Sequence, residues 1–167
     1  MNILFFACWY PNKYSINNGI FIKEHAKCIK YSGNKIIILS IIAIKSNHFF
    51  KKEIDVFIDE NGIKTHIIYL KSYFYKWIYI NLPLQYFFAF SYFKKTILSS
   101  FTPDVIHSNI VYPAGIIGNK IAKKINTPHY ISEHWSKLDK FFSRNVIVIK
   151  QKRHIIIAKK SLLYQIS

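Results

Sequence analysis

The chain has 167 residues and a mass of 19.8 kDa, which suits a single domain. Hydrophobic residues make up 51% of it and aromatic residues 17%, so its composition excludes an intrinsically disordered protein. The formal charge of +16 raises the question of a nucleic-acid partner. Only Arg144 and Arg153 carry the guanidinium group that phosphate and base readers favour, and the lysines are spread along the chain. We therefore expect no nucleic-acid partner, while a general attraction to anionic lipid stays open.

Cys8 and Cys28 form neither a C-x-x-C pair nor a disulfide framework, and we expect both to be small buried residues in a reducing compartment. The apolar start of the chain has no basic residue before Lys13, so a secretory signal is not expected and a cytoplasmic location is. The seven histidines show no ligand spacing, so we expect no metal and no bound cofactor.

Apolar, β-branched runs alternate with helical segments along the chain. The expected strands are residues 2–8, 35–44, 62–70, 104–108, 127–132 and 154–158. The expected helices are residues 19–31, 84–101, 113–125 and about 141–151, with a further helix beginning at Ser161. Residues 49–61 are expected to be irregular. This alternation predicts a doubly wound α/β fold with a mainly parallel sheet and helices on both faces. We expect the first helix to bury one side that comprises Phe21, Ile22, Ala26, Cys28 and Ile29.

Between Lys76 and Lys94 the sequence is uncharged and rich in aromatic residues. The run is slightly shorter than the roughly 20 residues that span a bilayer, and Asn81, Pro83 and Gln85 interrupt it. We expect a buried helix with an aromatic face. The alternative is a helix that rests on a membrane surface, which would give the protein a peripheral contact with the inner face of the membrane.

Ligands of open α/β sheets bind at the carboxyl ends of the strands, and three segments are expected there. The first is the loop from Trp9 to Gly19, where a glycine could bring backbone N–H groups close to a phosphate. The second begins at His107, which either binds a ligand or packs against the backbone. The third is residues 132–136, Ser-Glu-His-Trp-Ser, where two ionisable groups, an indole and hydroxyls are clustered. The third segment is the strongest candidate, although a turn with self-satisfied polar groups is the alternative.

Several of these motifs, taken in order, resemble the amino-terminal half of family 4 retaining glycosyltransferases. The resemblance rests on Ile3-Leu-Phe, Trp9-Tyr-Pro, Gly19-Ile-Phe-Ile-Lys-Glu24, Pro103-Asp-Val-Ile-His107, Pro113-Ala-Gly115, Ser132-Glu-His-Trp-Ser136 and the closing Ile155-Ile-Ile-Ala-Lys-Lys-Ser161-Leu162. It implies the GT-B architecture, in which two Rossmann-like domains face a cleft without an obligatory metal. Residues 1–167 would form one such domain, the half that mainly receives the acceptor.

The resemblance also implies roles for individual residues. Gly19 would lie near the donor phosphates, although the family usually has two glycines there and Asn18 replaces one of them. His134 would hydrogen-bond the transferred sugar near the reacting centre and is the expected catalytic residue. Glu133 and Ser136 would shape the pocket around that sugar. His107 would line the acceptor side.

The family's donor-binding domain has no counterpart in these residues, so the chain is expected to be inactive alone. The negative charge that develops on a departing nucleoside diphosphate needs cationic groups or helix dipoles, and that domain supplies them. The expected partners are a nucleotide sugar, a glycan or lipid-linked acceptor, and a separately encoded carboxyl-terminal domain. The alternative function is a non-catalytic module that binds a glycan or a nucleotide sugar.

Overall fold

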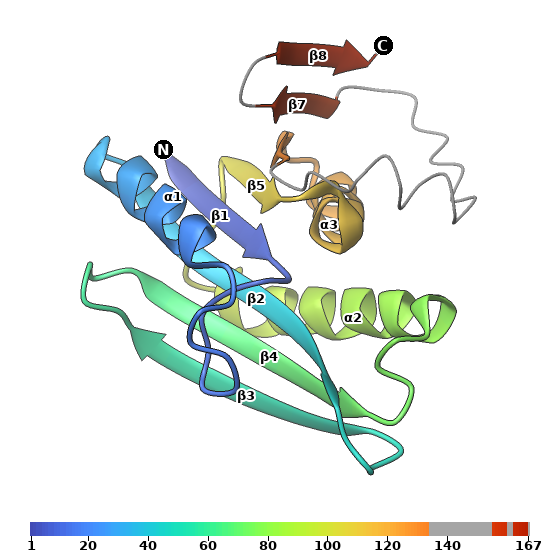
Figure 1. Cartoon of the computed structure of the whole chain (residues 1–167). Helices are drawn as coiled ribbons and strands as arrows, with labels where there is room; N and C mark the ends of the chain where they lie inside the picture. Colours follow the sequence, from blue (N-terminus) through green and yellow to red (C-terminus); the bar gives the residue numbers. More distant parts are fainter. Residues whose placement is uncertain (134–154, 160–161, 167) are drawn as a thin grey trace.

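The computed structural model describes residues 1–133, 155–159 and 162–166. These residues form a single sheet with helices on both sides (Figure 1). The strands are β1 (Asn2–Ala7), β2 (Lys35–Lys45), β3 (Lys51–Ile58), β4 (Lys64–Ser72), β5 (Val105–Asn109), β6 (His129–Ser132), β7 (Ile155–Lys159) and β8 (Leu162–Ile166). The helices are α1 (Ile20–Tyr31), α2 (Ile78–Tyr92) and α3 (Ile116–Ile125), with π-helical turns η1 (Phe93–Ile97) and η2 (Val111–Gly115).

The sheet order is β3-β4-β2-β1-β5-β6-β7-β8. All neighbours from β4 to β7 are parallel, whereas β3 and β8 are antiparallel to β4 and β7 at the two edges. The parallel strands, numbered along the chain, therefore follow the order 3-2-1-4-5-6 of a Rossmann-like sheet. The predicted doubly wound α/β fold is confirmed in this respect.

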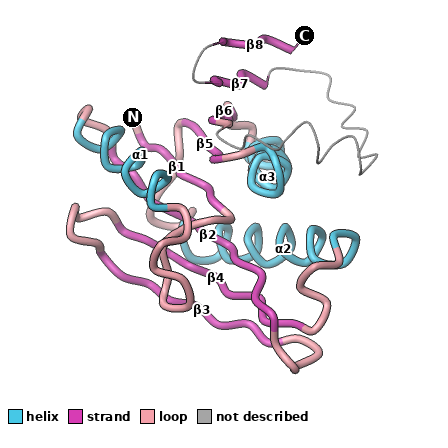
Figure 2. Tube along the Cα trace, in the orientation of Figure 1, coloured by secondary structure: helices cyan, strands magenta, loops and turns pink. Residues whose placement is uncertain are grey.

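Two apolar layers hold the sheet between its helices. Leu4 and Phe6 of β1 pack with α2 and α3 on one face, while Ile3 and Phe5 pack toward α1 on the other. Successive side chains of a strand point to opposite faces, so a strand covered on both sides must be apolar at every position. This requirement explains why β1 and β2 could be recognised from their continuous apolar runs. Figure 2 shows the long loop that leaves the end of β1 before α1 begins.

The prediction that residues 49–61 are irregular was wrong, because Lys51–Ile58 forms the edge strand β3. Its charged residues are compatible with an edge strand, which meets solvent along one side and is commonly protected by charges. Glu53 and Asp55 of β3 receive Lys13 from the loop after β1, and Glu53 also receives Lys71 of β4, with Nζ 2.5 Å from the carboxylate. The strand thus anchors the loop that leads to the first helix.

Helix α2 begins at Ile78, earlier than the predicted Leu84, and Pro83 lies inside it. A proline there leaves the carbonyl of Tyr79 without its helical donor. Tyr79 is 88% exposed, so water can reach the start of the helix, and the interruption is tolerated. The helix buries Asn81, Gln85 and Ala89 toward the sheet and passes into η1 instead of continuing to residue 101.

Four smaller predictions need correction. The predicted helix at 113–125 is α-helical only from Ile116, because η2 precedes it and Tyr112 has an extended backbone conformation. Residues from Leu162 form strand β8, antiparallel to β7, rather than a helix. Cys28 is exposed, and Phe21 is 46% exposed, so neither belongs to the buried side of α1. The helix predicted at 141–151 lies outside the described residues.

No helix in the described part of the chain combines the length and apolar character needed to cross a bilayer.

Candidate functional site

A cavity of about 380 Å³ opens where β1 and β5 end. Cys8 and Trp9, which follow β1, line one side of it, and Tyr112 and Pro113, which follow β5, line another. The chain moves from β1 outward to β2 and β4, and returns to the other side of β1 for β5. The strand order therefore reverses between β1 and β5, and open α/β sheets bind ligands at such a reversal. The cavity is our candidate functional site.

Three amide side chains line the cavity, two from α2 and one from the loop before α1. Asn81 and Gln85 come from the first half of α2, are each 6% exposed, and lie one helical turn apart. Asn18 comes from the loop that precedes α1. Asn81 donates a hydrogen bond to the carbonyl of Phe74 and so holds the chain before α2 in place. An amide can donate and accept at once, which suits a ligand that carries hydroxyl groups.

Three aromatic rings and one cationic side chain also line the cavity. The rings are those of Trp9, Tyr75 and Tyr112, and the cation is Lys76, whose Nζ lies 5.5 Å from the centre of the Tyr75 ring. Burial raises the pKa of the Tyr112 phenol to about 12, so its hydroxyl stays protonated at neutral pH. The described lining residues include neither a carboxylate nor an imidazole. The cavity can therefore hold a polar ligand, but its own side chains include no strong acid or base.

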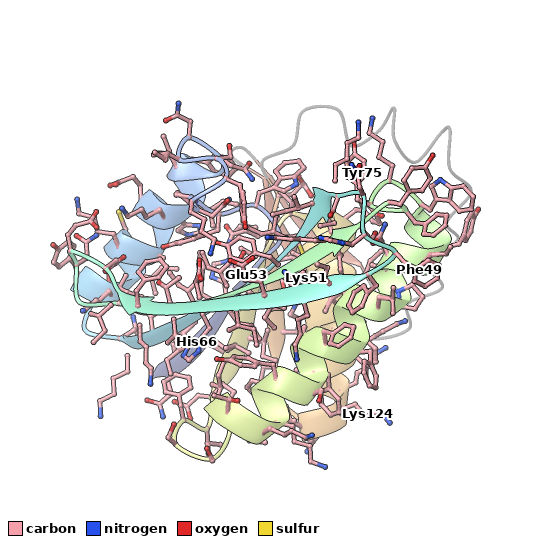
Figure 3. The ribbon with its side chains drawn as sticks, turned by 90° about the horizontal axis from the view of Figure 1, so that it is seen from below. Phe49, Lys51, Glu53, His66, Tyr75 and Lys124 are labelled. Atoms are coloured by element: carbon pink, nitrogen blue, oxygen red, sulfur yellow. The ribbon has the colours of Figure 1, made fainter. Side chains whose placement is uncertain are left out.

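The loop after β1 is fixed to the β3–β4 hairpin by ion pairs. Figure 3 shows Glu53 on β3, the strand that receives the tip of this loop. Tyr14 donates its hydroxyl to Glu53 at 3.1 Å, and Lys13 lies 3.0 Å from Asp55. Hydrogen bonds from Lys13 and then Lys71 lower the pKa of Glu53 to about 2. These contacts attach the loop to the β3–β4 hairpin, and Asn18, further along the same loop, lines the cavity.

Gly19 begins α1 with a left-handed backbone, φ +69°. A Cβ atom at this position would lie 2.7 Å from the carbonyl oxygen of Trp9 and 3.1 Å from the backbone nitrogen of Tyr10. The glycine thus lets the start of the helix press against the loop beneath it. It lies next to Asn18 at the edge of the cavity. The backbone of Gly19 lies close to the backbone of Trp9 and Tyr10.

The connection from β5 to η2 contains a strained residue. Ile110 has φ +64°, a conformation that branched side chains rarely adopt, and it is completely buried. Its N–H donates to the carbonyl of Ser132 at 2.7 Å, and its own carbonyl accepts from the N–H of Gly115 at 2.9 Å. The next residue, Val111, donates its N–H to Glu133 at 2.7 Å. These bonds hold the turn that presents Tyr112 to the cavity.

The predicted site residue His107 lies on the other face of the sheet from the cavity. Its Nε2 is 2.8 Å from the hydroxyl of Ser132, and its ring packs edge-on against Phe5 and His25, with centroids 5.0 and 5.1 Å away. It lines a separate hollow of about 460 Å³ beside β5 and β6. The structure therefore shows a packed and hydrogen-bonded His107, while the ligand-binding alternative stays a prediction, and it separates this residue from Asn18.

Asn109 is the neighbouring polar residue at the end of β5. It is completely buried, and neither atom of its amide has a hydrogen-bond partner among the described residues. Strand alternation places it on the same face as His107. A buried amide without partners is costly, so Asn109 is a second point at this edge where a ligand or a further polar group is expected.

Glu133 is a structural residue in this arrangement. Its side chain is 4% exposed and accepts the Val111 N–H, so it ties the end of β6 to the turn after β5. Its partner, Val111, lies outside the Ser132–Ser136 segment, so this bond does not test the alternative of a turn whose polar groups satisfy one another. His134 and Ser136, the other two predicted site residues of this segment, lie outside the described residues.

Replacing Glu133 with alanine should lower the free energy of unfolding by about 1–3 kcal/mol, because the buried Val111 N–H loses its acceptor. Glu133→Gln keeps an oxygen at the same place and should retain most of the stability. Denaturant unfolding of the two variants measures the difference. Equal destabilisation by alanine and glutamine would show that the hydrogen bond to Val111 is not what Glu133 contributes.

Sequence reasoning missed Asn81, Gln85, Lys76 and Tyr75 as site residues. Asn81 and Gln85 were noticed only as interruptions of an apolar run. Their spacing of four residues, which places both on one side of a helix, was the available signal. Lys76 and Tyr75 carried no such signal, because they lie in the connection between β4 and α2 and only the fold brings them to Trp9 and Tyr112.

Comparisons with protein-family models and with curated proteins found no match for this chain.

Proposed function

We propose that this chain is the acceptor-binding domain of a glycosyltransferase that moves a glycosyl group from a nucleotide sugar to a glycan or lipid-linked acceptor. The observation that carries the proposal is the cavity at the strand reversal between β1 and β5, with amides and aromatic rings in its wall. Further support comes from the ordered motifs that resemble the amino-terminal half of family 4 retaining glycosyltransferases. In that architecture the present domain would be one half of a GT-B fold.

The chemistry of the cavity fits a sugar better than a charged metabolite. Asn18, Asn81 and Gln85 offer donors and acceptors that match hydroxyl groups, and aromatic rings offer flat apolar surfaces for the C–H faces of a pyranose. The single cation, Lys76, could hold one phosphate, such as that of a lipid-linked sugar. An acceptor held here would present a hydroxyl group toward the carboxyl edge of the sheet.

In such an enzyme, the residues that bind the acceptor are separate from those that contact the transferred sugar, and the side chains of the cavity agree with this separation. The described lining residues offer no carboxylate or imidazole, so they bind and orient the acceptor and do not transfer protons. The resemblance assigns contact with the transferred sugar to His134, which follows Glu133 directly in the sequence. Glu133 would then act as a positioning residue, because the hydrogen bond that it accepts from Val111 fixes the chain directly before His134.

The cavity is tested by the affinity of simple sugars. We expect methyl glycosides of hexoses and N-acetylhexosamines to bind the full chain, measured by saturation-transfer-difference NMR titration. Gln85→Leu removes the amide at nearly constant volume and should weaken binding about tenfold, the effect of one or two lost hydrogen bonds. Asn18→Ala should act in the same direction.

Asn17→Ala is the matched control, because Asn17 is exposed beside Asn18 and does not line the cavity. It should leave sugar binding unchanged. Absence of binding by every glycoside, or equal affinity of Gln85→Leu and the unchanged protein, would refute the assignment of the cavity. Tight binding of UDP-glucose to the chain alone would instead favour a nucleotide-sugar binding module.

A further inference from the structure

The outer face of α2 is apolar and exposed. Tyr79, Ile80, Pro83 and Phe87 lie along one side of the helix, and the exposed fractions of the two rings are 88% for Tyr79 and 61% for Phe87. The helix contains no charged residue in any of its 15 positions. Helices at the surface of a water-soluble protein normally turn charged side chains outward. We therefore expect this face of α2 to contact another molecule.

Aromatic rings extend the apolar face beyond the start of the helix. Phe74 forms edge-on ring contacts with Phe49, Tyr73 and Trp77, at centroid distances of 5.7, 5.5 and 5.0 Å. Phe49, Tyr73 and Trp77 are 82%, 68% and 58% exposed. Figure 3 shows Phe49 and Tyr75 at the same end of the molecule, although they come from different connections. We call this ring cluster, together with the outer face of α2, the aromatic surface.

Among the described residues, the charged side chains that flank the aromatic surface are lysines. Lys76 precedes α2, Lys94 follows it, and Lys52 lies with Nζ 5.5 Å from the centre of the Phe88 ring. No aspartate or glutamate occurs from residue 25 to 52 or from residue 61 to 103, the segments that supply this surface. Lysine is depleted at protein–protein interfaces relative to the rest of the protein surface. An exclusively positive rim around exposed rings is complementary to anionic lipid.

We propose that the aromatic surface docks on an anionic lipid bilayer. Trp77, Tyr79 and Phe87 enter the interfacial region, where amphipathic and apolar rings are most stable, and α2 lies along the plane of the membrane. Lys52, Lys76 and Lys94 reach the headgroup phosphates with their ammonium groups. The docking does not depend on glycosyl transfer, so it can be tested separately from the proposed function.

The aromatic surface is continuous with the cavity at the carboxyl edge. Tyr75 and Lys76 line the cavity and belong to the connection that carries the ring cluster. Docking would therefore bring the cavity mouth close to the headgroups. If the cavity binds a sugar, this position suits an acceptor that is anchored in the lipid.

Cosedimentation of the full chain with vesicles tests the docking. Vesicles made of equal parts phosphatidylcholine and phosphatidylglycerol should bind the protein, and vesicles of phosphatidylcholine alone should bind it at least about tenfold more weakly. The variant Trp77→Ser/Tyr79→Ser/Phe87→Ser should lose at least about tenfold in partition coefficient on the anionic vesicles. Lys52→Gln/Lys76→Gln should lose about tenfold or more, since each lysine contributes about fivefold.

Two matched controls separate this surface from a general effect of charge and apolarity. Ile16→Ser/Tyr31→Ser/Ile58→Ser removes three side chains that are 77%, 70% and 70% exposed and lie elsewhere on the molecule. Lys27→Gln/Lys35→Gln removes the same charge, from α1 and from the first position of β2. Both controls should bind like the unchanged protein. Circular dichroism checks that all variants are folded.

Tryptophan fluorescence gives an independent measurement of the docked side chain. The emission should shift to shorter wavelength when anionic vesicles are added, and this shift should be lost in Trp77→Phe and kept in Trp9→Phe. Failure to bind anionic vesicles would overturn the proposal, as would equal loss of binding in the α2 variant and its control. Self-association through the aromatic surface without vesicle binding would identify a second copy as the occupant and would also overturn it.

Discussion

Gly19→Ala should destabilise the protein by about 2–5 kcal/mol, the sum of a strained left-handed alanine and an overpacked contact. The backbone at Gly19 has φ +69°, and an added Cβ would meet the carbonyl oxygen of Trp9 at 2.7 Å and its carbon at 2.9 Å. These are backbone atoms, so no side chain can rotate away to relieve the clash. Thermal or denaturant unfolding measures the loss.

Gly33→Ala is the control for the backbone conformation alone. Gly33 also has a positive φ, +83°, but an added Cβ would meet nothing within 4 Å. It should cost only about 1–2 kcal/mol, the price of the left-handed conformation. Equal destabilisation at the two positions would show that the contact between Gly19 and Trp9 does not matter. A larger loss of stability at Gly19 would show that the close contact with Trp9 accounts for the difference. The same contact would then help to hold the loop after β1 in place.

Lowering the pH from 7 to 4 should remove about 3 kcal/mol of stability through His129 alone, because burial holds the pKa of its imidazole in the folded chain near 4. Burial lowers the pKa of His129 from 6.5 to about 4, and its Nε2 lies 2.9 Å from the hydroxyl of Ser108. As the pH falls, His129 of the unfolded chain becomes protonated near pH 6.5, whereas His129 of the folded chain becomes protonated only near pH 4. Stability is complete above about pH 6.5 and falls as the pH approaches 4.

The variant His129→Gln isolates this effect. It can still donate a hydrogen bond to Ser108, but it has no proton to gain, so its stability should depend less on pH by about 3 kcal/mol between pH 7 and 4. His66 titrates in the same direction, since burial lowers its pKa to about 4 as well. A series of urea unfolding curves on His129→Gln and His66→Gln separates the two contributions. An unchanged pH dependence in His129→Gln would contradict the assignment.

The central parallel strands β1 and β2 could be predicted because both are covered on both faces. Continuous apolar runs such as Leu4-Phe5-Phe6 have no other stable position in a water-soluble protein, and their alternation with helical segments fixed the fold class. The edge strand β3 was missed for the opposite reason. It is exposed along one side, and its Lys, Glu and Asp residues resemble a loop in composition, although their charges pair with Lys13 and Lys71.

Helix boundaries depended on contacts that the sequence does not reveal. The second helix was expected to begin at Leu84, directly after Pro83. It begins at Ile78, because Asn81 and Gln85 pack toward the sheet and Asn81 caps the preceding chain through Phe74. Such packing can offset the lost hydrogen bond at proline, and propensity alone does not include it.

The edge of the sheet that carries the site could be predicted, but most of its residues could not. Asn18 was identified, and it lines the cavity. His107 and Glu133 were also predicted at this edge. His107 packs on the face of the sheet away from the cavity, and Glu133 supports the turn after β5. Whether a side chain points into a cavity depends on strand register and helix rotation, which the sequence pattern specifies only where one face is apolar.

The central claim is that the cavity between β1 and β5 binds a sugar acceptor, and NMR chemical-shift mapping tests it most directly. During titration with the glycoside that binds best, the indole resonance of Trp9 and the side-chain amides of Asn18, Asn81 and Gln85 should shift together along one binding curve. Shifts that cluster instead around His107 and Tyr130, in the hollow on the other face, would contradict the claim.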